Sequence, residues 1–180
     1  MNDHPGTPTS TVAPNAAPVL ETRPAFHRDN TDNQTVITLL NDALSLELEG
    51  VLRYRRHHFA SPGAGGIAGV AVAAELLKHS NEALAHADRL AARITQLGGV
   101  PIFIPAIGEP LASATKPTLR ALLTEDLVAE RVAVNTYASF VHTVGDRDPT
   151  TRRLFEDALA HEEDHAEELE DFLRHVSFSV

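Results

Sequence analysis

Several helix-length segments of this chain carry an acidic residue inside their apolar stripe, near the middle of the segment. Glu47 lies in line with apolar residues at offsets of three, four and seven, namely Leu40, Leu44, Val51 and Tyr54. This spacing marks one face of an α-helix. Because an isolated buried carboxylate is costly, several of them share a core only when they are protonated or neutralised. The chain is therefore constrained to a helical fold in which these acidic side chains meet a counter-charge.

Two further segments repeat this arrangement. Glu130 lies in line with Leu123, Leu127, Val134, Tyr137 and Val141. Glu162 and His165 share a stripe with Leu154, Ala158, Leu169 and Phe172. These stripes contain no Lys or Arg, so the sequence predicts a bound divalent metal as the counter-charge, with neutral imidazole completing the coordination. Glu-x-x-His on two helices of a bundle, with one Glu from each of two others, is the arrangement of di-iron and di-manganese carboxylate sites.

A second string that pairs a carboxylate with an imidazole is Glu82-Ala83-Leu84-Ala85-His86, in the middle of the chain. Taken singly, each such residue has a plainer interpretation. A Glu on an amphipathic helix is usually solvated at the edge of the stripe, and a lone His is usually a hydrogen-bonded core residue. The joint occurrence of a Glu in four helices, two of them with a nearby His, favours a metal site.

The helical pattern divides the chain into four helices, which we expect at residues 34–59, 68–97, 118–144 and 149–175. The run from Ser61 to Gly66 is expected to break the first helix from the second, and residues 145–149 to form a tight turn. Short loops make each pair antiparallel, whereas the stretch 98–117 is long enough to run the whole bundle length. The predicted fold is all-α, a ferritin-like four-helix bundle of two antiparallel hairpins joined by a long crossover.

The N-terminal segment and the composition of the chain limit its domain bounds, its cellular compartment and its partners. Residues 1–33 are rich in Pro, Thr, Asn and Ala without periodicity, so we expect a disordered tail before a bundle of residues 34–178. Cysteine is absent, which excludes thiolate metal sites and suits a reducing cytoplasm. The net charge of −10 argues against nucleic acid as a partner. We recognise no signal peptide and no stretch of about 18 apolar residues, so no membrane partner is expected.

Four stretches of sequence occur together in the order and spacing of a known family. They are Leu40-Asn41-Asp42-Ala43-Leu44-Ser45-Leu46-Glu47 with Tyr54, His86-Ala87-Asp88-Arg89 followed by Leu97-Gly98-Gly99-Val100-Pro101, Asp126-Leu127-Val128-Ala129-Glu130, and Glu162-Glu163-Asp164-His165. They resemble the bacterioferritin branch of the ferritin-like superfamily. By this resemblance, the ligands of a di-iron pair are Glu47, His86, Glu130, Glu162 and His165.

The resemblance also implies roles and an activity. Glu162 bridges the two ions, Glu47 and Glu130 are terminal carboxylates, and Tyr54 lies beside the pair. The implied reaction is oxidation of Fe(II) by O₂ or H₂O₂, with these four residues catalytic, for iron storage or detoxification. Such chains are expected to form homo-oligomers.

Two positions depart from the family pattern. A second bridging Glu belongs three residues before the His of the second helix, where this chain has Ala83, and Glu82 lies one residue too early, near the edge of the stripe. Either Glu82 reaches inward as a metal ligand, or His79 contributes, or the site has lost a bridge and binds iron weakly. The Met that holds haem in the family is replaced by Leu84, and Met1 is the single Met of the chain, so no Met-ligated haem is expected.

Other functions stay open at this point. The same donors suit manganese, as in a manganese catalase-like peroxide enzyme, and Ala83 suits a non-catalytic bundle with a decayed metal site that acts by assembly. DNA protection, as in the miniferritins, suits the chain least, because those proteins build their iron site between subunits. Five residues are interpreted as solvated surface, with a subunit interface as the alternative: Arg53, Arg55, Arg56, His57 and His58.

Overall fold

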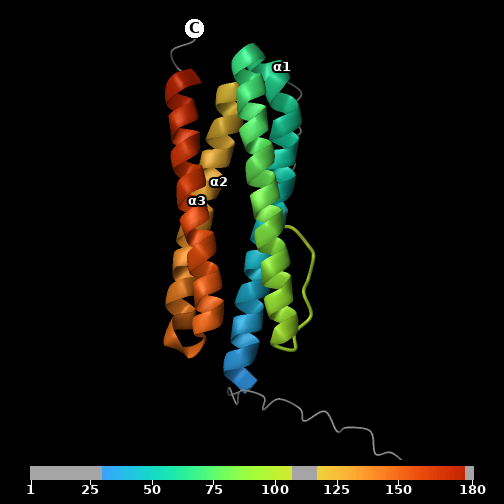
Figure 1. The fold of residues 1–180 in the computed structure, drawn as a ribbon, viewed down its shortest axis with the longest axis vertical. Helices are drawn as coiled ribbons and strands as arrows, with labels where there is room; N and C mark the ends of the chain where they lie inside the picture. Colours follow the sequence, from blue (N-terminus) through green and yellow to red (C-terminus); the bar gives the residue numbers. More distant parts are fainter. Residues whose placement is uncertain (1–29, 107–116, 177–180) are drawn as a thin grey trace, which may run out of the picture.

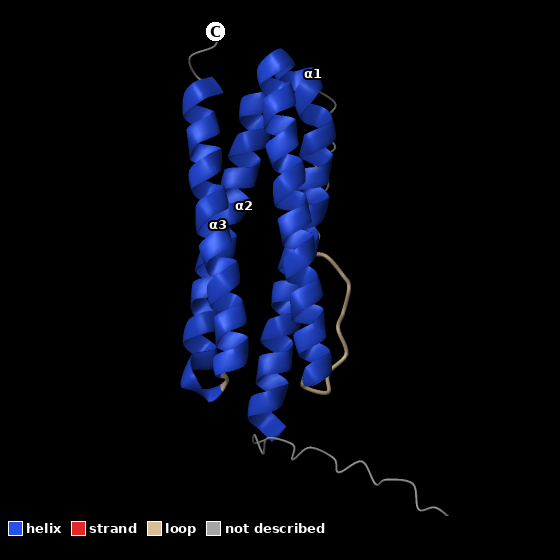
Figure 2. Ribbon diagram, viewed as in Figure 1, coloured by secondary structure: helices blue, strands red, loops and turns tan. Residues whose placement is uncertain are grey.

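The computed structural model describes residues 30–106 and 117–176, and every element of regular structure in these ranges is helical (Figure 1, Figure 2). The elements are α1 (Asn30–Gln96), α2 (Leu119–Val144), the short 3-10 helix η1 (Gly145–Arg147) and α3 (Pro149–Val176). Helix α1 has a kink at Gly66, where φ is 56° and ψ is −128°. We therefore distinguish a first segment of α1, residues 30–65, from a second segment, residues 67–96.

The helix boundaries lie close to the predicted ones. Of the expected tail, residues 1–29 lie outside the described residues, and residues 30–33 already belong to α1. The expected start of the third helix is confirmed, because the hydroxyl of Thr118 caps α2 by accepting a hydrogen bond from the N–H of Ala121 at 3.2 Å. The last helix begins at Pro149, as expected.

The reversal between the two segments of α1 takes place at a single glycine. We expected the whole run from Ser61 to Gly66 to break the helix, but helical structure continues through Pro62 and turns only at Gly66. Glycine adopts a positive φ without steric cost, which explains why the turn falls there. Gly69 then allows the chain to return closely, because a Cβ at this position would lie 2.1 Å from the carbonyl oxygen of Ser61.

The long helices lie side by side along one axis (Figure 1). The two segments of α1 are antiparallel, and so are α2 and α3, which η1 joins. The second segment of α1 ends at one end of the bundle and α2 begins at the other, so their connection crosses the length of the bundle. A Cβ on Gly65 would meet the side chain of Leu119, which places the start of α2 beside the α1 turn. The predicted ferritin-like bundle, with two antiparallel hairpins and a long crossover, is confirmed.

The described part of the crossover, residues 97–106, is attached to the first segment of α1. The side-chain oxygen of Asn41 accepts a hydrogen bond from the N–H of Ile102 at 2.8 Å. The hydroxyl of Ser45 donates to the carbonyl oxygen of Ile104 at 2.8 Å. Residues 107–116 of the expected crossover lie outside the described residues.

The apolar core consists of two clusters that lie apart along the bundle. The first includes Leu40, Leu44, Leu90, Ile94, Tyr137 and Phe155. The second includes Tyr54, Leu76, Leu123, Leu127 and Leu169. Along every helical segment, the buried residues between these two sets include an acidic residue or a histidine. We call this middle region the polar layer, and it contains the residues that the sequence singles out as metal ligands.

One helix passes a test for crossing a membrane by length and composition. Asp32–Gln96 contains an 18-residue window with a mean hydropathy of 1.3, so the expectation that the chain holds no such stretch is wrong. Of this window, 28% is buried, and the helix that contains it turns back on itself at Gly66. A single helix of this kind is weak evidence, so the window does not assign the chain to a membrane.

Candidate metal centre

The polar layer brings together residues from all four helical segments. Glu47 lies on the first segment of α1 and His86 on the second, Glu130 lies on α2, and Glu162 and His165 lie on α3. Their exposed fractions lie between 2% and 6%, so all five are buried. The in-stripe positions of these residues in the sequence therefore correspond to interior positions in the bundle.

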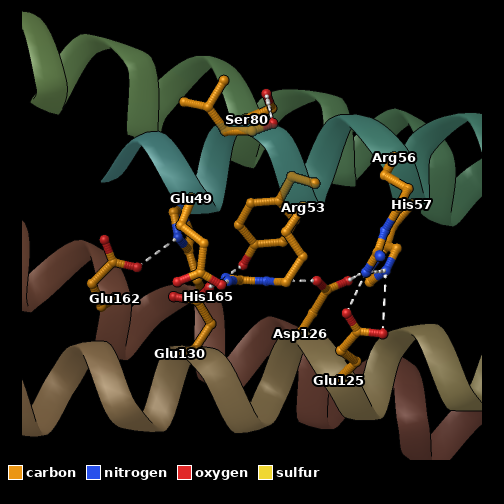
Figure 3. Close-up of polar contacts among 12 residues, drawn as sticks. Glu49, Arg53, Arg56, His57, Ser80, Glu125, Asp126, Glu130, Glu162 and His165 are labelled. Carbon is orange, nitrogen blue, oxygen red and sulfur yellow. Dashed lines mark hydrogen bonds and ion pairs between the residues drawn. The ribbon is translucent and has the colours of Figure 1, made fainter. Parts of the chain in front are cut away.

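Within the polar layer, two groups of three side chains share Glu162. One group is Glu47, His86 and Glu162, and the other is Glu130, Glu162 and His165; the donor atoms within each group lie within 4.8 Å of one another. Nδ1 of His86 lies 3.4 Å from an oxygen of Glu47. Nδ1 of His165 lies 3.4 Å from an oxygen of Glu162 (Figure 3). Two donor groups joined by one carboxylate suit two neighbouring cations.

Three atoms of these groups are buried without a hydrogen-bond partner among the described residues. They are Nδ1 of His86, Nδ1 of His165 and Oε2 of Glu130. An unpaired buried polar atom costs about 1–3 kcal/mol. Imidazole nitrogens and carboxylate oxygens are donors that Fe(II), Mn(II) and similar divalent ions accept, and a cation at each group would satisfy these atoms. The residues present therefore fit a divalent metal.

Glu130 and Glu47, which each belong to only one of the two groups, each accept a hydrogen bond from a tyrosine. Tyr54 donates to Glu130 at 2.6 Å, and Tyr137 donates to Glu47. Burial, together with these carboxylates, raises the pKa of both phenols well above the ordinary value, so both remain donors at neutral pH. The resemblance places Tyr54 beside the centre, but the sequence pattern marks Tyr137 only as part of an apolar stripe. Its partner lies on another helix, so only the structure reveals this contact.

Glu82 lies outside the two groups that share Glu162, but with His79 and His165 it forms a further group whose donor atoms also lie within 4.8 Å of one another. Its carboxylate accepts a hydrogen bond from Nε2 of His165 at 2.9 Å, and 34% of its side chain is exposed. This contact leaves Nδ1 of the same ring free to face Glu162, as expected for a carboxylate that orients a metal-binding histidine. Glu82 is thus placed to support a candidate ligand.

His79 repeats this arrangement one turn away. Its Nε2 lies 2.8 Å from an oxygen of Glu168, and its Nδ1 has no partner among the described residues. Its ring stacks on the ring of His165, with the centroids 4.0 Å apart. His79 is fully buried and therefore packs against the candidate ligand His165, but it belongs to neither group that contains Glu162.

A positive charge enters the polar layer where the sequence predicted none. We expected Arg53 at the solvated surface, yet only 9% of its side chain is exposed. Its guanidinium donates to Glu130 at 3.0 Å, to Asp126 at 3.2 Å and to Glu49 at 2.9 Å (Figure 3). The expectation is wrong because the position of a Cα on a helix does not fix where a long side chain ends. Arg53 neutralises part of the carboxylate charge even without a bound cation.

A second buried contact, between His57 and Asp126, fixes the position of Asp126. We also expected His57 at the surface, but it is fully buried, and its Nδ1 lies 2.8 Å from Asp126. Arg56 and Glu125 pair with each other at the exposed edge of this network (Figure 3). The surface interpretation is thus wrong for His57, whereas Arg56 is 45% exposed in its side chain. The network holds α2 against the first segment of α1 beside the polar layer.

Burial shifts the protonation of the carboxylates in the polar layer. It raises the pKa of Glu162 to about 7, and the neighbouring Glu47 contributes to this rise. Burial and the adjacent Glu162 raise the pKa of Glu130 well above its ordinary value, against the opposing effect of Arg53. Near neutral pH the polar layer therefore retains protons that a divalent cation would displace.

Residues 37–178 match the family model of the ferritin-like domain, so the chain belongs to the ferritin-like family. Within this family the chain is bacterioferritin-like, and the predicted resemblance is confirmed. Its structure is similar to that of Desulfovibrio desulfuricans bacterioferritin, with a TM-score of 0.73, 25% sequence identity and 82% of each chain covered. That structure is described with a diiron site in different catalytic states.

Two further solved structures support the same assignment. A Mycobacterium tuberculosis bacterioferritin gives a TM-score of 0.70 at 28% identity, covering 80% of this chain and 87% of that one. A bacterioferritin-related protein from Bacteroides fragilis, described as a dodecameric thioferritin, gives 0.67 at 27% identity, covering 81% and 88%. Among curated proteins, a sequence comparison finds no match.

Replacing Arg53 tests its role as a counter-charge. Breaking a buried ion pair costs about 3–5 kcal/mol, so R53Q is expected to lower the melting temperature of the metal-free protein. Because the guanidinium competes with a cation for Glu130, Mn(II) should raise the melting temperature of R53Q more than that of the wild type. R131Q, which removes an exposed ion pair with Glu170, is the matched control and should cost less than about 1 kcal/mol. Equal stabilisation of R53Q and wild type by Mn(II) would contradict the competition.

The raised pKa of Glu162 predicts that the metal-free protein loses stability as the pH rises. Between the ordinary value of 4.5 and about 7, the folded state keeps a proton that the unfolded chain has released. The stabilisation is therefore full below this range and lost above it, an effect of up to about 3 kcal/mol. In urea unfolding from pH 5 to pH 8, the wild type should lose stability relative to E162Q. E163Q alters the neighbouring exposed carboxylate and should behave as wild type; parallel curves for wild type and E162Q would refute the shift.

Proposed function

We propose that this chain binds Fe(II) at the two donor groups that share Glu162 and oxidises it, as an iron-storing or iron-detoxifying protein. The observation that supports this most directly is the set of buried donor atoms without partners, on His86, His165 and Glu130. A pair of divalent cations would satisfy these atoms. Membership of the ferritin-like family and the similarity to bacterioferritins support iron as the metal.

In this proposal each donor group binds one Fe(II) ion as substrate. Glu47 and His86 bind one ion, Glu130 and His165 bind the other, and Glu162 contacts both. Two Fe(II) ions together give up two electrons, which is enough to reduce H₂O₂ to water or O₂ to H₂O₂. The protons held by the buried carboxylates leave as Fe(II) binds, so binding should be tighter at higher pH.

The proposed role of Ala83 follows from what surrounds it. The residue is buried, 4% exposed, and lines a cavity beside Glu47 and Glu162. A Glu at this position would have room to add a second shared carboxylate. We infer that its absence weakens binding of the second Fe(II) ion and slows oxidation, and that Glu82 compensates only by orienting His165.

An anaerobic Fe(II) titration followed by addition of O₂ or H₂O₂ tests the proposal. The wild type should bind Fe(II) at saturable sites and develop ferric absorbance, and E162Q should bind at least about tenfold more weakly. E163Q should match the wild type. A83E should raise both the affinity and the oxidation rate, whereas A83L, which adds similar volume without oxygens, should raise neither. Binding of only trace iron by the wild type would contradict the proposal and favour a non-catalytic bundle.

We also propose that the chain assembles with copies of itself. Large apolar side chains are exposed on α1 and α2, namely Leu52, Phe59, Ile67, Val70, Leu84, Val128 and Val132. These side chains are available for apolar contacts between copies, and the Bacteroides fragilis relative is described as dodecameric. Light scattering during size-exclusion chromatography is expected to give several times the mass of one chain, 19.4 kDa. A monomer mass at micromolar concentration would contradict assembly.

A further inference from the structure

A cavity of about 190 Å³, partly open to solvent, lies within the polar layer, and residues from all four helical segments line it. Its walls include Glu47, Glu130, Glu162 and His165, which are candidate metal ligands. A buried water molecule needs about 10–15 Å³ of such space, so the cavity accepts several waters or one small organic ion. The space therefore adjoins the donor atoms directly.

Small residues create this space. Ala83 and Gly50 line the cavity from the two segments of α1, which pack closely here, because a Cβ added to Gly50 would already be in van der Waals contact with the Cβ of Ala83, 3.9 Å away. Ala133 lines the cavity from α2. Ala83 therefore contributes no oxygen to the cavity at the position where the family pattern would place a carboxylate.

A buried guanidinium forms part of the same wall. Arg53 lines the cavity, and nine-tenths of its side chain is buried. Among the described residues, three carboxylates accept one N–H each from this guanidinium, those of Glu49, Asp126 and Glu130. Because a guanidinium carries five N–H donors, Arg53 retains donors for a further acceptor. Planar oxyanions with two adjacent oxygens are the acceptors that a guanidinium matches best.

The charge of the cavity depends on whether cations are bound. Without them, Arg53 faces the carboxylates of Glu47, Glu49, Glu130 and Glu162, and burial keeps protons on Glu130 and Glu162 near neutral pH, so the cavity has no net positive charge to attract an anion. Two divalent cations at the donor groups would reverse this balance, because their four positive charges and the guanidinium then face the four carboxylates that line the cavity. An anion would therefore enter this space together with the metal and not before it.

We propose that the cavity beside Ala83 binds a small carboxylate or carbonate ion, which enters with the divalent cations and supplies oxygen donors that the second segment of α1 lacks. Arg53 holds this anion from the wall of the cavity. The inference rests on the proposed metal centre and extends it, since it makes tight metal loading dependent on a second, diffusible ligand.

A titration with Mn(II) alone tests this, because Mn(II) needs no oxidant and is counted by electron paramagnetic resonance. The purified full chain is titrated in chloride buffer depleted of CO₂, and again with millimolar formate, acetate or bicarbonate. We expect each effective anion to tighten binding of the second Mn(II) ion at least about tenfold and to increase the signal of coupled Mn(II) pairs. The three arms identify which small anion the cavity accepts.

Variants at the cavity separate this effect from a general influence of the anion. A83E carries its own carboxylate and should bind the second Mn(II) ion tightly without formate and gain nothing from it. A83L fills the space without oxygens and should remain weak in both buffers. R53Q should lose most of the formate response, whereas the exposed-site control R131Q should keep all of it. If A83E does not fold, the formate responses of A83L and R53Q, compared with that of the wild type, still test the proposal.

The outcomes of this experiment are distinguishable. Equal affinity for the second Mn(II) ion with and without the anions would overturn the anion site and leave the metal centre intact. A formate response that persists in A83L would also overturn it, because the cavity would then be irrelevant. Failure of the wild type to bind Mn(II) in any buffer would remove the metal centre itself, and with it both proposals.

Discussion

The carboxylates of Glu47, Glu130 and Glu162 place negative charge in an interior that cannot solvate it. Three features of the structure offset this buried negative charge. Tyrosine hydroxyls donate to two of the carboxylates, the guanidinium of Arg53 pairs with Glu130, and raised pKa values keep protons on the acidic groups near neutral pH. None of these satisfies the free imidazole nitrogens. The polar layer is thus stable enough to fold and still has donors left for a cation.

Helical periodicity located the carboxylates because a Glu side chain is short, so the direction of its Cα on the helix decides where it ends. The same reasoning failed for Arg53, whose longer side chain starts away from the stripe and still reaches Glu130. It left Glu82 undecided for a related reason: a side chain at the edge of the stripe can reach inward as a metal ligand or stay outside the site. Only the packed structure shows that the carboxylate meets the outer nitrogen.

The order and direction of the helices followed from loop lengths alone, since a short loop leaves no choice but an antiparallel return. The exact position of the turn within α1 did not follow from the sequence. A proline is expected to end a helix, yet Pro62 lies within helical structure and Gly66 carries the reversal. The close passage of Gly69 past Ser61 explains the need for so many small residues there, and this contact between two helical segments is not encoded in any local pattern.

The separation of the apolar core into two clusters has a consequence for how the molecule responds to change. Side chains without shared contacts contribute almost independently to the free energy of unfolding, so sequence variation at one end of the bundle is insulated from the other. Only the polar layer, which lies between the two apolar clusters, couples them. A coordinated ion there would join the two ends, and amide-exchange rates at both ends would then depend on whether the metal is bound.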